Sequence, residues 1–230
     1  MKKILDSLYM ISGIGEAAVF VIDKQDGYCL IDTGIFKRTN QLISILESNG
    51  HPVNKLRTIY LTHCHCDHIG GTAELVKSSG AQVAAHSGDI PFILQEKVIS
   101  GPYHDMMIQE QRVMKQFDCV VSRVDITCHD EENIQILGGL KVINVPGHTP
   151  GSMALYQPDK KIMFFGDVIR NHPKRGLVVG IPERFNVDTE QVKVDAARLL
   201  DYPIEYALFS HGDPIIGNAS AVIQKTIHLH

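Results

Sequence analysis

The amino-acid sequence predicts an α/β fold in which two similar halves stack sheet on sheet, with helices on the outside. Short β-like runs occur in two batches, and each batch is followed by helical and β-like segments that alternate. No repeat, low-complexity tract or linker divides the 230 residues, of which 44% are hydrophobic. We therefore expect a single domain over residues 1–230, with enough apolar residues for a sizeable core.

The first half opens with β-like runs and continues with helical patterns. Three runs are expected to be strands: Leu8–Ile11, Ala17–Ile22 and Tyr28–Ile31. Asp26-Gly27 is typical of a hairpin turn between the last two. Apolar residues at helical spacing predict a helix over 39–49, closed by Asn49-Gly50. A strand at Leu56–Leu61, a helix at 71–79 and a strand at 82–85 then follow.

The second half repeats this order after a long helical stretch. Residues 87–117 are expected to be mostly helical, with a break near Gly101-Pro102. Five short β-like runs follow: 123–127, 133–136, 140–145, 152–156 and 161–165. A helix with Asp188 as its N-cap is expected to run to about Leu200. A strand at 205–209 and a helix from about 217 complete the prediction.

Composition excludes several classes of partner. The chain has 22 Lys and Arg against 26 Asp and Glu, a net charge of −4, without a run of like charges. This balance indicates no nucleic-acid partner and no membrane partner. Asp6 and Glu16 interrupt the apolar N-terminus, which therefore does not resemble a signal peptide, and no apolar stretch is long enough to span a membrane. Five cysteines, an odd number, favour free thiols in a soluble, cytoplasmic protein.

The segment His63-Cys64-His65-Cys66-Asp67-His68 is the main functional feature. Residues two apart on an extended segment point the same way, so His63 and His65 can reach one metal together. After the chain turns, Asp67 and His68 can face a second metal. Imidazole and carboxylate ligands suit zinc, and also iron or manganese.

Two other interpretations of this segment are a surface loop and a structural zinc site. It could be a histidine-rich surface loop, although three His and one Asp within six residues at the end of a strand rarely arise by chance. It could also be a structural zinc site with cysteine ligands, but Cys119 and Cys128 lack the CxxC spacing that such sites use. In the extended segment Cys64 points away from the metal face, and Cys66 is expected to pack near the site.

Three distant residues complete the set of candidate ligands. His148 lies in a turn rich in Gly and Pro, Asp167 follows Phe164-Phe165-Gly166, and His211 follows Leu208-Phe209-Ser210. Each stands at the end of a β-like run. Taken singly, such residues are more often turn or capping residues. Together with the histidine segment they predict a rim of ligands along one sheet edge, where α/β folds bind ligands and metals.

The combined pattern HxHxDH, PGHTPGS, GD and a final His-Gly resembles the metallo-β-lactamase superfamily, over about residues 8–215. The resemblance implies a four-layer αββα sandwich, and it implies that Asp32, in the Asp32-Thr33-Gly34 turn, supports the metal loop from behind. It also assigns the ligands to two metals. His63, His65 and His148 fall on the first, Asp67, His68 and His211 on the second, and Asp167 bridges both.

The same resemblance favours particular branches of the family. True β-lactamases of this fold usually have a Cys at one position of the second metal and no bridging Asp. The presence of Asp167 and His68 therefore points to the hydrolase branches that include hydroxyacylglutathione hydrolases, lactonases and phosphodiesterases.

The expected activity is hydrolysis of a small-molecule ester, thioester or lactone with two Zn²⁺ per chain, Fe or Mn being alternatives. Two divalent cations about 3.5–4 Å apart can share a bridging water, lower its pKa and hold a hydroxide nucleophile. Their positive charge stabilises the anion that forms on attack. Asp67 is the expected catalytic residue, because it can orient the hydroxide and carry its proton.

The substrate is less well specified. Hydroxyacylglutathione hydrolases carry a C-terminal helical domain, whereas this chain ends 19 residues after His211. Lactonases have a Tyr three residues after the bridging Asp, where this chain has Arg170. The helical segment 87–117 is expected to cap the site and to contribute Tyr103 and His104. The loop 168–187 contributes Arg170 and His172, which with Lys174 and Arg175 hint at an anionic substrate or form only a solvated basic loop.

Other activities remain possible on this sequence. A mononuclear iron persulfide dioxygenase resembles the HxHxDH pattern but does not need His211. A phosphodiesterase could use the same two-metal site. A non-catalytic metal-binding protein is disfavoured by the complete ligand set. The sequence leaves the substrate, the native metal and the oligomeric state open.

Overall fold

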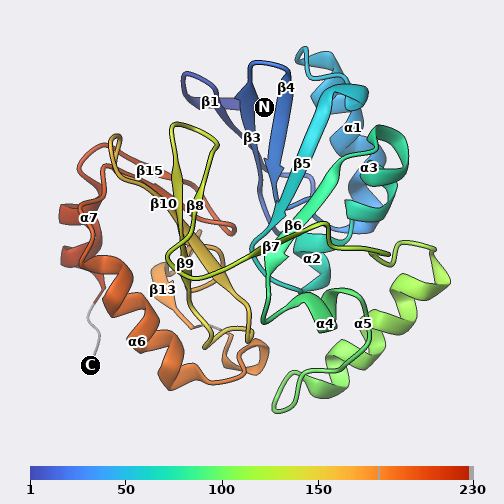
Figure 1. Ribbon diagram of the computed structural model, residues 1–230. Coiled ribbons are helices and arrows are strands. Elements are labelled where there is room, and N and C mark those ends of the chain that lie inside the picture. The colour runs from blue at the N-terminus through green and yellow to red at the C-terminus, as the bar shows by residue number, and fades with distance from the viewer. Residues whose placement is uncertain (181, 228–230) are drawn as a thin grey trace.

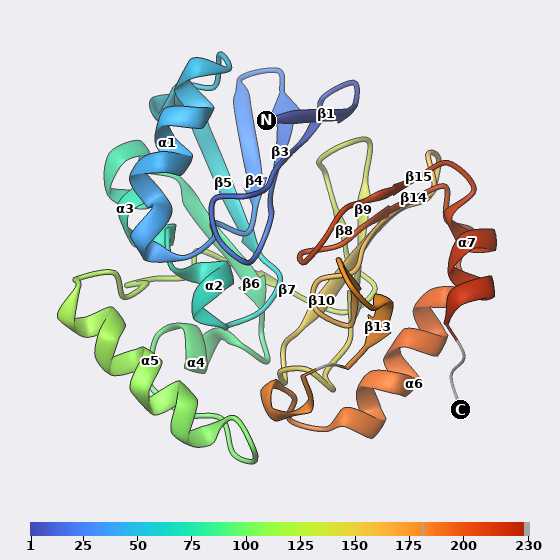
Figure 2. The ribbon, with the colours of Figure 1, turned by 180° about the vertical axis from the view of Figure 1, so that it is seen from behind.

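Two β-sheets face each other, and helices cover the outer face of each sheet (Figure 1). The structure is a computed structural model and describes residues 1–180 and 182–227. Helices α1 and α3 lie outside one sheet, and α6 and α7 lie outside the other (Figure 2). The expected αββα sandwich of two stacked halves is confirmed.

The first sheet has seven strands in sequence order, and the pairing of neighbouring strands changes from antiparallel to parallel along that order. The strands are β1 (Lys2–Leu5), β2 (Leu8–Ile11), β3 (Val19–Lys24), β4 (Gly27–Ile31), β5 (Leu56–Leu61), β6 (Gln82–His86) and β7 (Ile126–Cys128). From β4 onwards all neighbours are parallel, and parallel strands need long crossovers. The crossovers contain α1 (Thr39–Ser48), α2 (Cys66–Ile69), α3 (Thr72–Ser79), α4 (Ile90–Ile93) and α5 (His104–Gln116).

The second sheet has six strands in the order β15-β14-β11-β10-β9-β8. Their bounds are β8 (Asn133–Ile134), β9 (Leu140–Asn144), β10 (Met153–Gln157), β11 (Ile162–Phe164), β14 (Tyr206–Leu208) and β15 (Ile215–Ile216). The outer helices are α6 (Thr189–Leu200) and α7 (Ala219–Thr226). The Asp188 side chain accepts a hydrogen bond from the Gln191 backbone N–H at 3.0 Å, so the predicted N-cap of α6 is confirmed.

Alternation along the strands divides the apolar residues among three cores. In β10, Met153 and Leu155 point into the core between the sheets, whereas Ala154 and Tyr156 pack toward the outer helices. The two sheets are also joined by aromatic contact. The rings of Phe20 and Phe164 meet edge to face with centroids 5.1 Å apart. Each sheet is therefore buried on both faces, which explains the continuous apolar runs in its strands.

The structure corrects two expectations about the long connections. Residues 87–117 are helical only in α4 and α5, because the intervening residues 94–103 form turns and irregular backbone. Gly101 has a φ of +95°, and the Pro that follows it disfavours a helical conformation at that position. The loop 168–187 contains an unpredicted hairpin of β12 (Ile169–His172) and β13 (Gly176–Val179). Within this loop, Ile181 lies outside the described residues.

Short 3₁₀ helices, free cysteines and the lack of membrane-spanning helices among the described residues complete the description of the fold. Three single-turn 3₁₀ helices lie at Phe36–Arg38, Val53–Lys55 and Glu183–Phe185. All five cysteines are free thiols. Within residues 1–180 and 182–227, no helix combines the length and the apolar character that crossing a membrane requires.

Candidate metal centre

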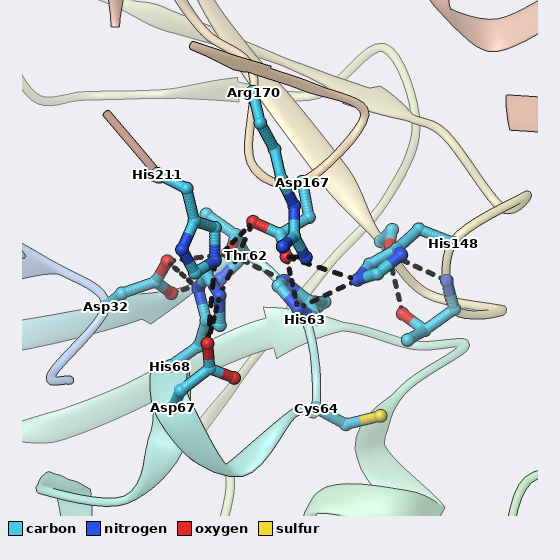
Figure 3. Close-up of polar contacts among 12 residues, drawn as sticks. Asp32, Thr62, His63, Cys64, Asp67, His68, His148, Asp167, Arg170 and His211 are labelled. Atoms are coloured by element: carbon cyan, nitrogen blue, oxygen red, sulfur yellow. Dashed lines mark hydrogen bonds and ion pairs between the residues drawn. The ribbon is translucent and has the colours of Figure 1, made fainter. Parts of the chain in front are cut away.

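Loops that follow strands of both sheets carry the candidate ligands. His63 and His65 follow β5 of the first sheet, and α2, which comes next, carries Asp67 and His68. The remaining ligands come from the second sheet: His148 follows β9, Asp167 follows β11 and His211 follows β14. The expected rim along one sheet edge is therefore wrong in one respect, since the ligands converge from two sheets (Figure 3).

All seven candidate ligands come together in two neighbouring groups. His63, His65, His148 and Asp167 form the first group, and Asp67, His68 and His211 form the second. Within each group the potential ligand atoms lie within 4.8 Å of one another. Such spacing places several nitrogen and oxygen atoms around a common point, as a bound cation requires.

Asp167 contacts both groups through different oxygens. Its Oδ2 lies 3.8 Å from His63 Nε2 and 3.5 Å from His148 Nε2. Its Oδ1 lies 3.2 Å from His211 Nε2 and 3.5 Å from His68 Nε2. One carboxylate thus faces candidate ligands of both groups.

Several buried polar atoms in the two groups lack a hydrogen-bond partner among the residues that the structure describes. They are His65 Nε2, His68 Nε2, Asp167 Oδ1 and His211 Nε2. A buried polar atom without a partner is costly, so such a concentration calls for a ligand. Imidazole nitrogens and carboxylate oxygens are donors that zinc accepts, so these residues fit divalent metal ions.

Burial and neighbouring charges set the protonation of the cluster. Burial lowers the pKa values of His63 and His65 well below their ordinary range, which keeps both imidazoles neutral and able to bind a metal. Burial acts in the same direction on His68, but the carboxylates of Asp167, Asp67 and Asp32 raise its pKa well above the usual value. Burial opposes ionisation of Asp167, yet Arg170, His211 and His68 hold its pKa well below the usual value.

Residues behind the cluster orient the histidine rings. The Asp32 carboxylate accepts hydrogen bonds from the Thr62 backbone N–H and hydroxyl at 2.8 and 2.7 Å. The same carboxylate lies 2.8 Å from His68 Nδ1, which turns Nε2 of that ring toward the cluster. Asn186 Oδ1 lies 2.8 Å from His148 Nδ1 and orients that ring in the same way. Sequence reasoning anticipated Asp32 and missed Thr62 and Asn186, because neither stands in a distinctive sequence pattern.

Asp89 connects two of the ligand loops. Its buried carboxylate accepts hydrogen bonds from the Cys64 backbone N–H at 2.8 Å, the Thr149 hydroxyl at 2.6 Å and the Gly151 backbone N–H at 2.6 Å. Cys64 stands between His63 and His65, and Thr149 follows His148. Asp89 therefore fixes the loops of the three first-group histidines relative to one another, a role that no sequence pattern indicated.

The cysteines of the histidine segment lie where they were expected. The Cys64 side chain points away from the cluster (Figure 3). Cys66 lines the cavity in front of the cluster, outside both groups of candidate ligands. Burial raises the pKa of both thiols, which disfavours the thiolate that binds metals.

A cavity of about 280 Å³ opens onto the cluster beside His65 and Asp67. The lining includes Tyr103, which precedes α5, Met106 and Glu110 of α5, and Arg170 of β12. The Tyr103 ring lies against His65 with centroids 4.1 Å apart. The predicted contacts Tyr103 and Arg170 thus reach the cavity.

His104 and His172, the other two predicted contacts, do not line this cavity. The His104 ring is exposed and pairs with Asp105 at 3.0 Å. The His172 ring accepts a hydrogen bond from the Lys174 backbone N–H at 3.1 Å and lines a separate cavity of about 440 Å³. His104 was expected at the cavity because it stands at the break of the helical segment, and His172 because it belongs to the basic loop after Asp167. The local backbone directs these two side chains elsewhere.

Comparison with known proteins identifies relatives of this chain. Residues 13–211 match the family model described as Metallo-beta-lactamase superfamily. Two probable metallo-hydrolases of Bacillus subtilis, YflN and YybB, are 24% and 28% identical to the chain over 206 and 201 residues. These matches cover 83% and 86% of this chain and 77% and 81% of the relatives.

A partial match to a curated enzyme and a match to a solved structure agree with this family. A hydroxyacylglutathione hydrolase of Pseudomonas aeruginosa is 25% identical over 170 residues, which are 73% of this chain and 52% of the relative. The match thus spans about half the length of that relative. Among solved structures, a metallo-beta-lactamase family protein of Thermus thermophilus superposes with a TM-score of 0.72 at 20% identity, covering 97% of this chain and 81% of the other. At this identity the likeness shows a shared fold.

Proposed function

Because this chain belongs to the metallo-beta-lactamase superfamily, we propose that it is a two-metal hydrolase of a small ester, thioester or lactone. His63, His65 and His148 would hold the first ion, and Asp67, His68 and His211 the second. Asp167 would bridge them. Imidazole nitrogens and carboxylate oxygens are ligands that zinc accepts, which favours zinc at both positions.

The position of Asp167 is the observation that carries this proposal. Asp67, His68 and His211 lie within reach of one another and form a second group of candidate ligands, which a single-metal site would leave without an ion. Asp167 directs one oxygen to each group. This symmetry favours a two-metal hydrolase over a mononuclear iron dioxygenase.

Two bound cations would lower the pKa of a water molecule and polarise the carbonyl group of the substrate. The chain's own residues supply position and proton transfer. Asp67 is a quarter exposed and lines the cavity, so its carboxylate can accept a proton from a water molecule there. Met106 and Phe185 give the cavity apolar lining, against which an apolar part of a substrate can pack.

The names of some relatives support hydrolysis of acyl compounds. Several relatives are named hydroxyacylglutathione hydrolase, whereas two are named probable metallo-hydrolase without a substrate and one is named alkyl/aryl-sulfatase. Acyl transfer to water also fits the small cavity volume, because a compact acyl group fits beside the cluster.

Metal analysis of the purified protein, followed by a hydrolase screen, tests the proposal. We expect two zinc ions per chain and turnover of a thioester, lactone or nitrophenyl ester that a chelator abolishes. The screen also includes phosphodiesters and β-lactams. One iron per chain with oxygen uptake on glutathione persulfide would instead support the dioxygenase.

Substitution of the ligands provides a second test. Asp167→Ala and His148→Ala should each lose bound metal and hydrolysis together, with a fall in kcat/KM of about 1000-fold or more. Asp105→Ala is the matched control, because that carboxylate is almost fully exposed on α5. Hydrolysis that survives in the metal-free variants would contradict the mechanism.

A further inference from the structure

Arg170 is the basic residue that reaches the metal cavity. Of the four basic residues predicted to matter in the loop 168–187, it alone lines that cavity, whereas His172, Lys174 and Arg175 are exposed on the β12–β13 hairpin. Figure 3 shows its side chain extending from β12 toward Asp167. Only 17% of the side chain is exposed.

Most of the hydrogen-bonding capacity of Arg170 is unused. A guanidinium group has five N–H donors. One terminal nitrogen donates to Asp167, and this is its one ion pair within the described residues. Its Nε is buried and has no partner within that same part of the chain. A buried cation with free donors is costly unless an anionic group binds to it.

The acidic residues of the cavity do not supply that anionic group. The Asp67 carboxylate faces His68 and His211, the other candidate ligands of the second group. Glu110 accepts a hydrogen bond from the Tyr103 hydroxyl, and burial raises the pKa of its carboxyl group, which favours the neutral form. Glu16 is exposed at the cavity rim. Apart from its ion pair with Asp167, Arg170 therefore has N–H donors that remain available to an anionic ligand.

From these contacts we propose that Arg170 selects substrates that carry a carboxylate close to the bond that is hydrolysed. The planar guanidinium matches a carboxylate with two parallel hydrogen bonds. Because Arg170 touches the carboxylate that lies between the two ligand groups, the bound anion lies only a few atoms from the reacting carbonyl carbon. Ile35, Met106 and Phe185 accept the apolar part of the substrate. This inference rests on the proposed hydrolase function.

A matched pair of esters tests the inference. The metal-loaded protein should hydrolyse mono-4-nitrophenyl succinate with a kcat/KM about tenfold or more above that of 4-nitrophenyl butyrate, which lacks the carboxylate. Arg170→Met should reduce this ratio about 10- to 100-fold. Arg170→Lys should reduce it less, because lysine keeps the positive charge but cannot make the two parallel hydrogen bonds of a guanidinium. Arg175→Met, on the same hairpin but exposed, should leave the ratio unchanged.

Calorimetry with succinate, butyrate and inorganic sulfate separates failure of the inference from failure of the proposed function. Succinate should bind the metal-loaded protein more tightly than butyrate, and Arg170→Met should remove this difference. Tighter binding of sulfate than of succinate would overturn the assignment to a carboxylate. Metal-dependent hydrolysis without preference for the succinate ester, or a preference that Arg170→Met retains, would overturn the inference and leave the hydrolase intact. Absence of metal-dependent hydrolysis of all substrates would overturn the proposed function, whatever calorimetry shows of Arg170.

Discussion

At the scale of single residues, the candidate site depends on which nitrogen of each histidine faces inward. His68 directs Nδ1 to Asp32 and His148 directs Nδ1 to Asn186, so that both Nε2 atoms face the cluster. A hydrogen bond to one ring nitrogen fixes the tautomer and the orientation of the other. Burial adds to this by keeping His63 and His65 neutral through their lowered pKa values.

Asp32→Asn tests this control of ring orientation. The φ of Asp32 is +60°, a conformation that Asn tolerates, so the backbone should be retained. The amide cannot accept from Thr62 and His68 as the carboxylate does, and zinc affinity at the second group should fall about 10- to 100-fold. Competition with a chromogenic chelator measures the affinity.

Asp26→Asn serves as the control, because the Asp26 side chain is 64% exposed and far from the cluster in the β3–β4 turn. Wild-type zinc affinity in Asp32→Asn would show that the carboxylate is not needed to orient His68.

At the scale of elements, the site depends on the relative position of loops that follow strands of different sheets. Asp89 follows β6 and joins the loop after β5 to the loop after β9 through three hydrogen bonds. Close packing leaves no room for adjustment there. A Cβ atom on Gly151 would lie 2.2 Å from the Asp89 backbone nitrogen. The histidines of the first group thus depend on a contact between elements.

Asp89→Ala should weaken the first group more than the second. Loss of the three hydrogen bonds frees the loops of His63, His65 and His148, so zinc affinity at one of two sites should fall about 10- to 100-fold. Chelator competition that resolves two sites measures this, and circular dichroism monitors the fold. Thr149→Val, which removes one of the three bonds, should have a smaller effect.

Asp105→Ala again provides the exposed carboxylate control. Equal weakening of both sites in Asp89→Ala would indicate a general loss of structure and contradict a specific link between the two loops.

At the scale of the whole molecule, metal binding should stabilise the assembly of the two sheets. The first group joins His63 and His65 from the first sheet to His148 and Asp167 from the second. A cation held by both sheets exists only in the folded state, so its binding free energy adds to the free energy of unfolding.

Chelation should therefore lower the thermal midpoint of unfolding. Zinc at 100 times its dissociation constant contributes about 2.7 kcal/mol per site, which corresponds to roughly 5–10 °C for a chain of this length. Differential scanning calorimetry with and without chelator measures the shift, and added zinc should reverse it. An unchanged midpoint in a protein shown to have lost its metal would contradict a centre shared by the sheets.

The sequence by itself determined the layered fold and the identity of the candidate ligands. Nearly continuous apolar runs in β4 and β10 specify strands buried on both faces, and ligand-type residues at strand ends mark the candidate metal site. These are local patterns, and local patterns are readable from sequence. They did not predict the β12–β13 hairpin, because Ile169–His172 lacks alternation.

Only the tertiary structure decided how the ligands combine and what stands behind them. That Asp167 faces both groups, that Asp89 joins two loops and that Arg170 points into the cavity while His172 points away all depend on contacts between distant segments. The relative placement of two sheets sets these distances, and the packing of side chains such as Phe20 on Phe164 sets that placement. The spacing of residues along the chain does not reveal the relative placement of the two sheets.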